Sequence, residues 1–363
     1  MKRLMLAGVV SFCSLSAYSA SVLAESKAPR IINGDYASIE ATPWQAFLTI
    51  GNRFQGSYSC GGIIISDNYV LTAAHCVDGF RAGDIKIFAG FESREYSGVG
   101  ISASAVTMHP DYEDFQFTAD IALVKLASAL PSTVKPIRLL SPTEQSEMDT
   151  EFNGAASQNL YVSGWGSTST NGDASQYLRK TYLNGVRDLS CSWVNQFGYD
   201  QNLADAYVCA NETFTTGICS GDSGGPLVWQ NKNNAGDADM GYRAVGIVSF
   251  SSAFFGCGSP SAEDGFSQIS TYYDWINQNM DGGYTEPTPT FTQDIFDQSV
   301  NYNPVGNPPI VPVYPGSGED SDGGEEDVTP PPTPPISGSG GGGSFAWLSL
   351  LSLGLLIFRR RLS

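Results

Sequence analysis

This 363-residue sequence has few basic residues, only two histidines and no hydrophobic run of full membrane-spanning length. Lys and Arg number 19 against 37 Asp and Glu, which gives a formal net charge of −18. Residues 281–344 hold ten of the acids and no Lys or Arg, so more than half of the excess lies there. Because nucleic-acid phosphates are bound by cations, this composition excludes a nucleic-acid partner.

The apolar run nearest the C-terminus, Phe345–Phe358, is short for a membrane span. Its 14 residues would extend about 21 Å as a helix, against a hydrocarbon core of about 30 Å. It follows a glycine-rich stretch and precedes Arg359–Arg361, which would keep that end in the cytoplasm. The arrangement resembles the glycine-glycine C-terminal sorting signals of Gram-negative bacteria, whose apolar tail an intramembrane rhomboid-type protease removes. A short permanent membrane anchor is the alternative.

The N-terminus has the pattern of a secretory signal peptide. Lys2 and Arg3 precede the apolar run Leu4–Val10, and small residues continue to Ala24. We expect cleavage before Glu25 and export across the inner membrane, to an extracellular or surface-attached location.

Six cysteines lie beyond this segment, and they allow fifteen pairings, among which spacing alone cannot choose. Bridges between them imply an oxidising compartment, and we predict disulfides with a stapling role and no metal site. The six are Cys60, Cys76, Cys191, Cys209, Cys219 and Cys257.

The middle of the chain alternates apolar and small polar residues in short runs. Turn-forming residues interrupt these runs about every ten positions, which predicts an all-β domain of many short strands. Examples of the runs are Trp44–Ile50, Gly61–Ile65, Ile85–Phe88 and Arg243–Ser249.

A glycine-rich turn at Cys219–Pro226 presents Ser223 beside Asp222. A serine hydroxyl is a weak nucleophile and needs a base, an orienting acid and an oxyanion site. His75 and Asp120 are the upstream candidates. The other histidine, His109, precedes a proline and is interpreted as structural.

With these flanks and this order of His, Asp and Ser, the sequence resembles the trypsin/chymotrypsin family of serine endopeptidases over residues 31–280. Several independent motifs carry the resemblance. They are Ile31–Gly34, Pro43–Gln45, the His75 and Asp120 segments, Gly164–Gly166 and the Ser223 turn.

The resemblance implies two antiparallel six-stranded β-barrels with the active site in the cleft between them, and a helix at the end of the domain. It implies a triad of His75, Asp120 and Ser223, with an oxyanion hole at Gly221 and Ser223. It also implies the disulfide pairs Cys60–Cys76, Cys191–Cys209 and Cys219–Cys257. No cofactor is expected.

The resemblance further implies activation by cleavage after Arg30. Such cleavage by an activating protease would free Ile31, whose ammonium would pair with Asp222, because a buried anion needs a cation. Residues 25–30 would then be a short propeptide, and the secreted form a zymogen.

The specificity pocket departs from that of trypsin. Where the trypsin branch has an aspartate at the pocket base, this sequence has Gly217, followed by Ile218. Counting without gaps places Asp264 on the pocket wall, as in some collagenolytic crustacean members, which predicts a broad or partly basic preference. A one-residue slip, with Gly265 on the wall, is the alternative.

The edge of that pocket falls on Ser249, Phe250 and Ser251, and is expected to pair with the substrate backbone. The loop Phe88–Gly98 is short compared with calcium-binding members, and we assign it no calcium.

The predicted organisation is therefore a signal peptide (1–24), a propeptide (25–30), a protease domain (31–280), a linker (281–344) and an apolar sorting segment (345–363). The linker is rich in Pro, Gly and acids and is expected to be an extended, solvated, disordered stalk. A weak apolar patch on it is expected to pack back onto the protease domain, and consists of Phe291, Ile295, Phe296 and Val300. The expected substrates are proteins or peptides. The protein is expected to be a monomer, with transient or anchored membrane contact through its C-terminal segment. A catalytically silent adhesion module and a narrow processing protease are the alternatives.

Overall fold

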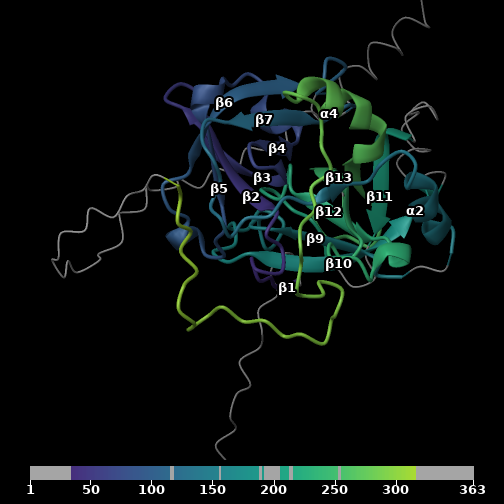
Figure 1. Ribbon diagram of the computed structural model, residues 1–363. Helices are drawn as coiled ribbons and strands as arrows, with labels where there is room; N and C mark the ends of the chain where they lie inside the picture. Colours follow the sequence, from purple (N-terminus) through teal and green to yellow (C-terminus); the bar gives the residue numbers. More distant parts are fainter. Residues whose placement is uncertain are drawn as a thin grey trace, which may run out of the picture.

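Short antiparallel strands form most of the ordered structure (Figure 1). The computed structural model describes residues 34–114, 118–154, 157–187, 190–191, 205–211, 216–251 and 255–315. The predicted signal peptide, the predicted propeptide and residues 316–363 therefore lie outside the described residues, as do Arg30 and Ile31.

The first barrel is a closed ring of six antiparallel strands in the order β2-β3-β4-β7-β6-β5. Strand β5 shows why the sequence folds this way, since Ile85, Ile87 and Ala89 are buried while Lys86 points to solvent. The strands are β2 Gln45–Asn52, β3 Gly56–Ser66, β4 Tyr69–Thr72, β5 Ile85–Ala89, β6 Ile101–Met108 and β7 Ala122–Leu126.

The second barrel closes through pairings of β9 with both β10 and β12. The ring runs β9-β10-β11-β14-β13-β12, with β1 added at β10 and β8 lying parallel to β13. The strands are β1 Asp35–Tyr36, β8 Arg138–Leu139, β9 Leu160–Gly164, β10 Arg179–Val186, β11 Tyr207–Asn211, β12 Pro226–Gln230, β13 Tyr242–Phe250 and β14 Asp264–Gln268. The predicted double-barrel architecture is confirmed.

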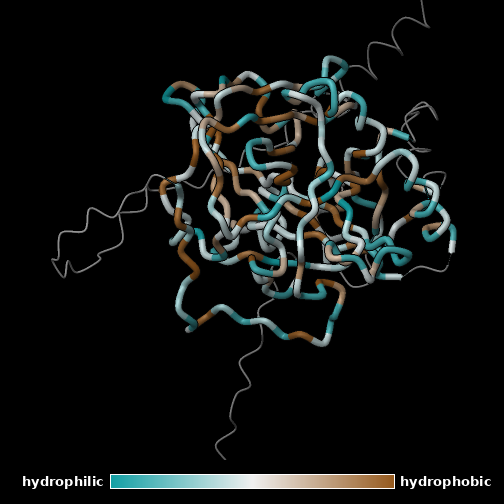
Figure 2. The backbone as a smooth tube through the Cα atoms, viewed as in Figure 1, coloured by the Kyte–Doolittle hydropathy of each residue, from teal (hydrophilic) through white to brown (hydrophobic). Residues whose placement is uncertain are grey.

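The α-helices of the described residues are short. They are α1 Ala74–Val77, α2 Gln145–Phe152 and α4 Tyr273–Asn279, the last being the predicted helix at the end of the domain. Figure 2 shows hydrophobic segments along the inner strands and hydrophilic loops around them. One buried cluster fills the first barrel and continues into the second through Tyr161, Tyr182 and Tyr242.

Residues 281–315, here called the strap, differ from the solvated stalk expected for them. The strap has no regular secondary structure, yet it leaves α4, crosses the second barrel and returns to the first barrel (Figure 1). Phe291 and Ile295 are buried, and Phe296 packs against the core cluster, whereas Val300 is 54% exposed. The patch therefore packs back through three of its four predicted residues.

Within the part of the chain that the structure describes, no helix has the length and apolar character needed to cross a bilayer.

Candidate active site

His75 and Asp120 meet where the first barrel faces the second. His75 lies in α1 directly after β4, and Asp120 lies directly before β7, which pairs with β4. The His75 Nδ1 atom is 2.7 Å from Asp120 Oδ2, and the His75 backbone N–H donates to Asp120 Oδ1 at 2.8 Å. Because a carboxylate only accepts, Nδ1 carries the proton and Nε2 is left with its lone pair.

Two serines of the second barrel also hold Asp120, which is fully buried. The hydroxyl of Ser249 donates to Asp120 Oδ2 at 2.6 Å, and that of Ser267 donates to the Asp120 carbonyl at 2.8 Å. The preceding Ala119 has a φ of 48°, a left-handed conformation that few non-glycine residues adopt. These contacts fix the carboxylate between the two barrels.

The charge of Asp120 controls the protonation of His75. Burial lowers the pKa of His75, but the Asp120 charge and hydrogen bond outweigh it, so that the net pKa lies above the ordinary 6.5. Asp120 therefore favours the protonated imidazolium form of His75.

Ser223 is held beside this pair by backbone contacts. Its carbonyl accepts from the Gly61 N–H at 2.7 Å and lies 3.7 Å from the Sγ of Cys76, the neighbour of His75. Gly224 has a φ of 81°, and a Cβ there would lie 2.2 Å from Thr72 Oγ1. The glycine after Ser223 is thus required by both conformation and space.

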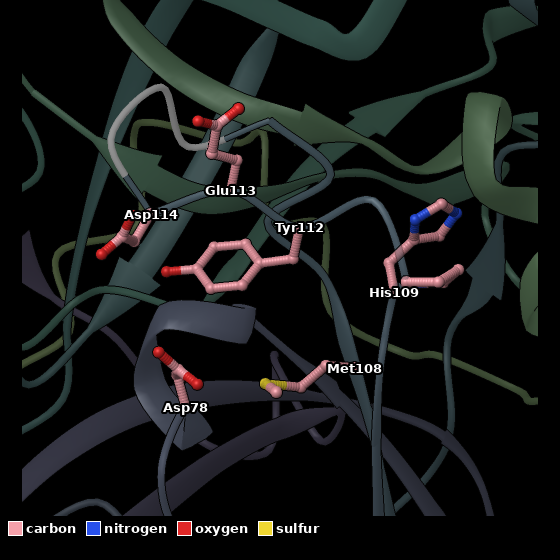
Figure 3. Close-up of a pocket in the computed structure, with 7 residues that line it drawn as sticks. Asp78, Met108, His109, Tyr112, Glu113 and Asp114 are labelled. Atoms are coloured by element: carbon pink, nitrogen blue, oxygen red, sulfur yellow. The ribbon is translucent and has the colours of Figure 1, made fainter.

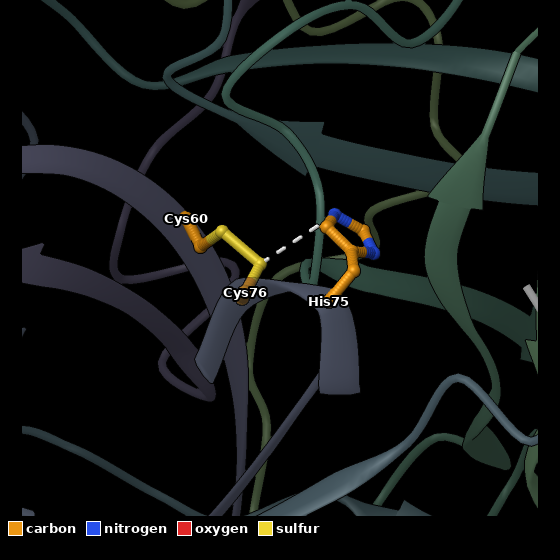
Figure 4. A group of neighbouring side chains, drawn as sticks. All are labelled: Cys60, His75 and Cys76. Carbon is orange, nitrogen blue, oxygen red and sulfur yellow. Dashed lines mark hydrogen bonds between the residues drawn. A yellow bond between two sulfur atoms is a disulfide. The ribbon is translucent and has the colours of Figure 1, made fainter. Parts of the chain in front are cut away.

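The disulfides match the three pairs that the resemblance implied: Cys60–Cys76, Cys191–Cys209 and Cys219–Cys257. Figure 4 shows the first of them beside His75, with the contact from His75 Nε2 to Cys76 Sγ at 3.8 Å. Cys60, His75 and Cys76 are close enough to resemble a metal-ligand set. Because both sulfurs are in a disulfide, neither is available as a thiolate ligand.

The predicted oxyanion segment turns sharply at Gly221. This glycine has a φ of 96°, and a Cβ there would lie 3.2 Å from the Gly166 Cα. Gly221 and Ser223 flank Asp222, so the same turn positions all three residues.

Asp222 is fully buried and accepts backbone hydrogen bonds. The Gly166 N–H donates to its Oδ1 at 2.8 Å, and the Cys219 N–H donates to its Oδ2 at 3.0 Å. Burial raises the pKa of Asp222 to about 7, although both N–H groups act to lower it. The Asp222 carboxyl therefore stays neutral up to a higher pH than an exposed aspartate does.

The predicted pocket residues Phe250 and Asp264 lie on two neighbouring strands, β13 and β14. Phe250 pairs with Gly265, and a Cβ on Gly265 would lie 2.3 Å from the Phe250 ring. Side chains alternate along a strand, so Asp264 shares a face with Phe266 rather than with the Phe250 ring. Phe266 and Ile218 belong to one buried cluster, and Asp264 is 6% exposed.

The remaining predicted pocket positions differ in burial and in contacts. Gly217 is buried, Ser251 is half-buried, and Ser249 combines its edge position with the bond to Asp120.

An open groove lies beside His75 and Asp120 on the first barrel (Figure 3). Its lining joins the end of α1 to the loop before Asp120. His109 lies on its rim, where its Nδ1 accepts from the Asp111 N–H and its ring packs on Tyr272 and Trp275. Burial lowers the pKa of His109, as expected of a structural histidine. The lining residues are Asp78, Met108, His109, Pro110, Tyr112, Glu113 and Asp114.

Two contributions to the site could not be read from the sequence. Ser249 was predicted only as a pocket edge, and Ser267 carried no signal. Both act through hydroxyl groups that reach Asp120 across the barrel interface, and no local motif records such a contact.

Comparison with known proteins gives one consistent family. The family model described as Trypsin matches residues 31–276. Trypsin alpha-4 of Lucilia cuprina is 31% identical over 280 residues, which are 75% of this chain and 97% of that protein. Chymotrypsin-C of Bos taurus is 29% identical over 281 residues, covering 75% of this chain and 98% of that protein.

A solved structure agrees with this. The structure titled HL collagenase superposes with a TM-score of 0.55 at 30% sequence identity, and covers 68% of this chain and 97% of the collagenase.

Proposed function

Because this chain belongs to the trypsin family of serine endopeptidases, we propose that it hydrolyses peptide bonds in proteins through an acyl-enzyme on Ser223. In this mechanism His75 Nε2 takes the proton of the Ser223 hydroxyl as Oγ bonds to the substrate carbonyl carbon. The C–N bond then breaks, and the same proton passes to the leaving amine. In the second half of the reaction His75 Nε2 takes a proton from water as the water oxygen bonds to the acyl carbon. The ester bond to Ser223 Oγ then breaks, the proton returns to Oγ, and the carboxylic acid is released.

The contact between His75 and Asp120 carries this proposal. Asp120 fixes the tautomer that leaves Nε2 unprotonated and stabilises the imidazolium that forms during transfer. We assign the backbone N–H groups of Gly221 and Ser223 to the oxyanion. These roles are those of the family's own triad, whose sequence motifs this chain retains.

We also propose activation by cleavage after Arg30, with the new Ile31 ammonium paired to Asp222. Among the described residues, the partners found for the Asp222 side chain are backbone N–H groups. A buried carboxylate without a cation is costly, and its raised pKa reflects that cost. An ammonium delivered there would offset it and order the Ser223 turn.

This activation predicts a pH-dependent difference in stability. In the uncut chain the Asp222 carboxyl has a pKa of about 7, above its ordinary 3.8, so its contribution to stability is complete below pH 3.8 and is lost as pH rises through 7. We expect a higher Tm for the cut protein than for the uncut protein, by a margin that widens from pH 5 to pH 8. The comparison uses Ser223→Ala protein, cut by added trypsin, against Ser223→Ala/Arg30→Gln.

The Arg30→Gln partner is matched because it differs only in resisting the cut. A Tm difference between cut and uncut protein that is equal at pH 5 and pH 8, or that persists in Asp222→Asn protein, would contradict the pairing of the Ile31 ammonium with Asp222. N-terminal sequencing of the cut protein must begin at Ile31.

For the substrate, we propose a broad preference that includes Lys and Arg, with Asp264 as the source of negative charge. Its place on the face shared with Phe266 favours this over the alternative in which Gly265 forms the wall. The carboxylates of Asp78, Glu113 and Asp114 in the neighbouring groove add to the negative potential around the site.

The test is the cleavage profile of a diverse peptide library by the activated enzyme. We expect Lys and Arg among several accepted residues before the cut. Asp264→Asn should lower kcat/KM for Lys and Arg peptides by about 10-fold to 100-fold, the range for loss of a charged hydrogen bond, and change Leu and Phe peptides little. The neighbouring Glu263→Gln is the control. An apolar-only profile would mean that the pocket is uncharged, and dominance of one sequence would favour a narrow processing protease.

The disulfides and the family relatives indicate an extracellular protein. We further propose that the 1–24 signal peptide directs export from a Gram-negative cell and that an intramembrane protease removes residues 345–363. The intact mass of the exported protein tests the second step, since a chain that still ends at Ser363 would support the permanent anchor instead.

A further inference from the structure

The strap is held by groups that recognise its backbone. The Ile295 N–H donates to the Tyr242 hydroxyl at 3.1 Å, and the Tyr182 hydroxyl donates to the Ile295 carbonyl at 2.7 Å. The Tyr242 hydroxyl in turn donates to the Asp294 carboxylate at 3.1 Å. Two tyrosines of the second barrel thus satisfy both backbone groups of one strap residue, as a strand neighbour would.

Aromatic rings form the apolar part of the same seat. The ring of Phe291 stacks on Tyr242 at 5.9 Å and meets Trp44 edge-on at 4.8 Å. The Phe296 ring lies 6.0–6.4 Å from the rings of three barrel tyrosines. We call this surface, formed by Trp44, Tyr161, Tyr182 and Tyr242, the aromatic seat.

The strap occupies the seat as a peptide ligand would. Its buried positions are separated by exposed ones, and the stretch 297–301 between Phe296 and Tyr302 is exposed throughout. The strap also lies beyond residue 276, where the family match ends.

A second set of contacts joins the strap to the N-terminal segment and the first barrel. Glu92, 4% exposed, accepts the Ile39 N–H with Oε1 at 2.9 Å and the Tyr302 hydroxyl with Oε2 at 2.6 Å. The Tyr314 hydroxyl accepts the Ala89 N–H at 3.2 Å and donates to the Ser97 carbonyl at 3.1 Å. Withdrawal of the strap would leave a buried carboxylate oxygen of Glu92 without this donor.

We propose that the aromatic seat is a peptide-binding site, specific for a segment with an aromatic residue, Ile four positions later and a second aromatic residue five positions later. The strap fills it in cis through Phe291, Ile295 and Phe296. Its occupancy also fixes the segment around Ile39, which follows the activation site, through Tyr302 and Glu92. This site is distinct from the catalytic one and does not depend on the proposed catalytic chemistry.

The test uses full-length protein carrying Ser223→Ala, so that catalysis plays no part. Phe291→Ala/Ile295→Ala removes two of the three strap side chains that fill the seat, and Val300→Ala/Val305→Ala, at strap residues 54% and 53% exposed, is the matched control. The probe is a fluorescent synthetic peptide of residues 288–298. We expect it to bind the seat variant and raise its Tm. The parent and the control should bind at least about 10-fold more weakly, because a tethered segment competes at millimolar effective concentration.

Equal binding to the seat variant and the parent would overturn the proposal, as would a seat variant that loses stability yet binds no peptide. A second measurement does not need the double variant to fold. Tyr302→Phe removes one oxygen, and we expect faster hydrogen exchange at the Ile39 amide than in Val305→Ala. Unchanged exchange there would overturn the coupling to the N-terminal segment.

Discussion

Ser223→Ala is expected to lower kcat by about 10⁶-fold, the scale seen where the serine of a triad is removed. The variant keeps the backbone of the glycine-rich turn and therefore the proposed oxyanion groups. What it loses is the oxygen that forms the acyl-enzyme, so only the residual rate from binding and oxyanion stabilisation should remain.

The measurement is peptide hydrolysis by cut, purified protein, with active-site titration to exclude traces of wild type. Ser220→Ala is the control, because Ser220 is exposed in the same turn and has no assigned chemical role. Its rate should stay within a few-fold of wild type. Wild-type turnover by Ser223→Ala would end the triad assignment, and an inactive wild type would support the silent adhesion module.

Asp120→Asn is expected to lower kcat by about 10⁴-fold at neutral pH, which is the known effect of this change in the family's own triad. The physical reason lies in the contact between Asp120 and His75. An amide NH₂ at position 120 can donate to Nδ1, which would then accept, and the proton would move to Nε2 where the base is needed.

The same substitution should shift the pH dependence of the residual activity. Asp120 raises the pKa of His75 through its charge and its hydrogen bond, while burial lowers it. Removing the charge leaves burial dominant, so the acid limb of the kcat/KM profile should move to lower pH. Asp114→Asn removes an exposed charge from the neighbouring groove and is the control. An acid limb that moves to higher pH, or equally in both variants, would show that Asp120 does not set the His75 pKa.

The sequence was informative where function depends on local backbone. The Ser223 turn and the cysteine beside His75 are each short segments whose residue types serve one purpose. The structure brings His75 into contact with Asp120, buries Asp222 and contains the three disulfide pairs that the resemblance implied. The run at Arg243–Ser249 falls within β13, and all of the run at Trp44–Ile50 except Trp44 falls within β2.

The strap could not be predicted in the same way. Its composition, rich in Pro, Thr and acids, is that of a solvated linker, and the anchors Phe291, Ile295 and Tyr314 are too widely spaced to form a periodic pattern. What orders it is a surface made by Trp44, Tyr182 and Tyr242, residues from three distant strands or turns. A segment that folds against a preformed receptor carries little signal of its own.

The route of the strap decides where mechanical load enters the domain. Tension along the chain from residue 316 onward would first reach Tyr314 and its bonds to Ala89 and Ser97 on the first barrel. Helix α4 and the second barrel would carry that tension only after the contacts at Tyr302, Ile295 and Phe291 had been sheared in turn. In a protease held by such a tail, the strap contacts would therefore break one after another before the tension could unwind α4.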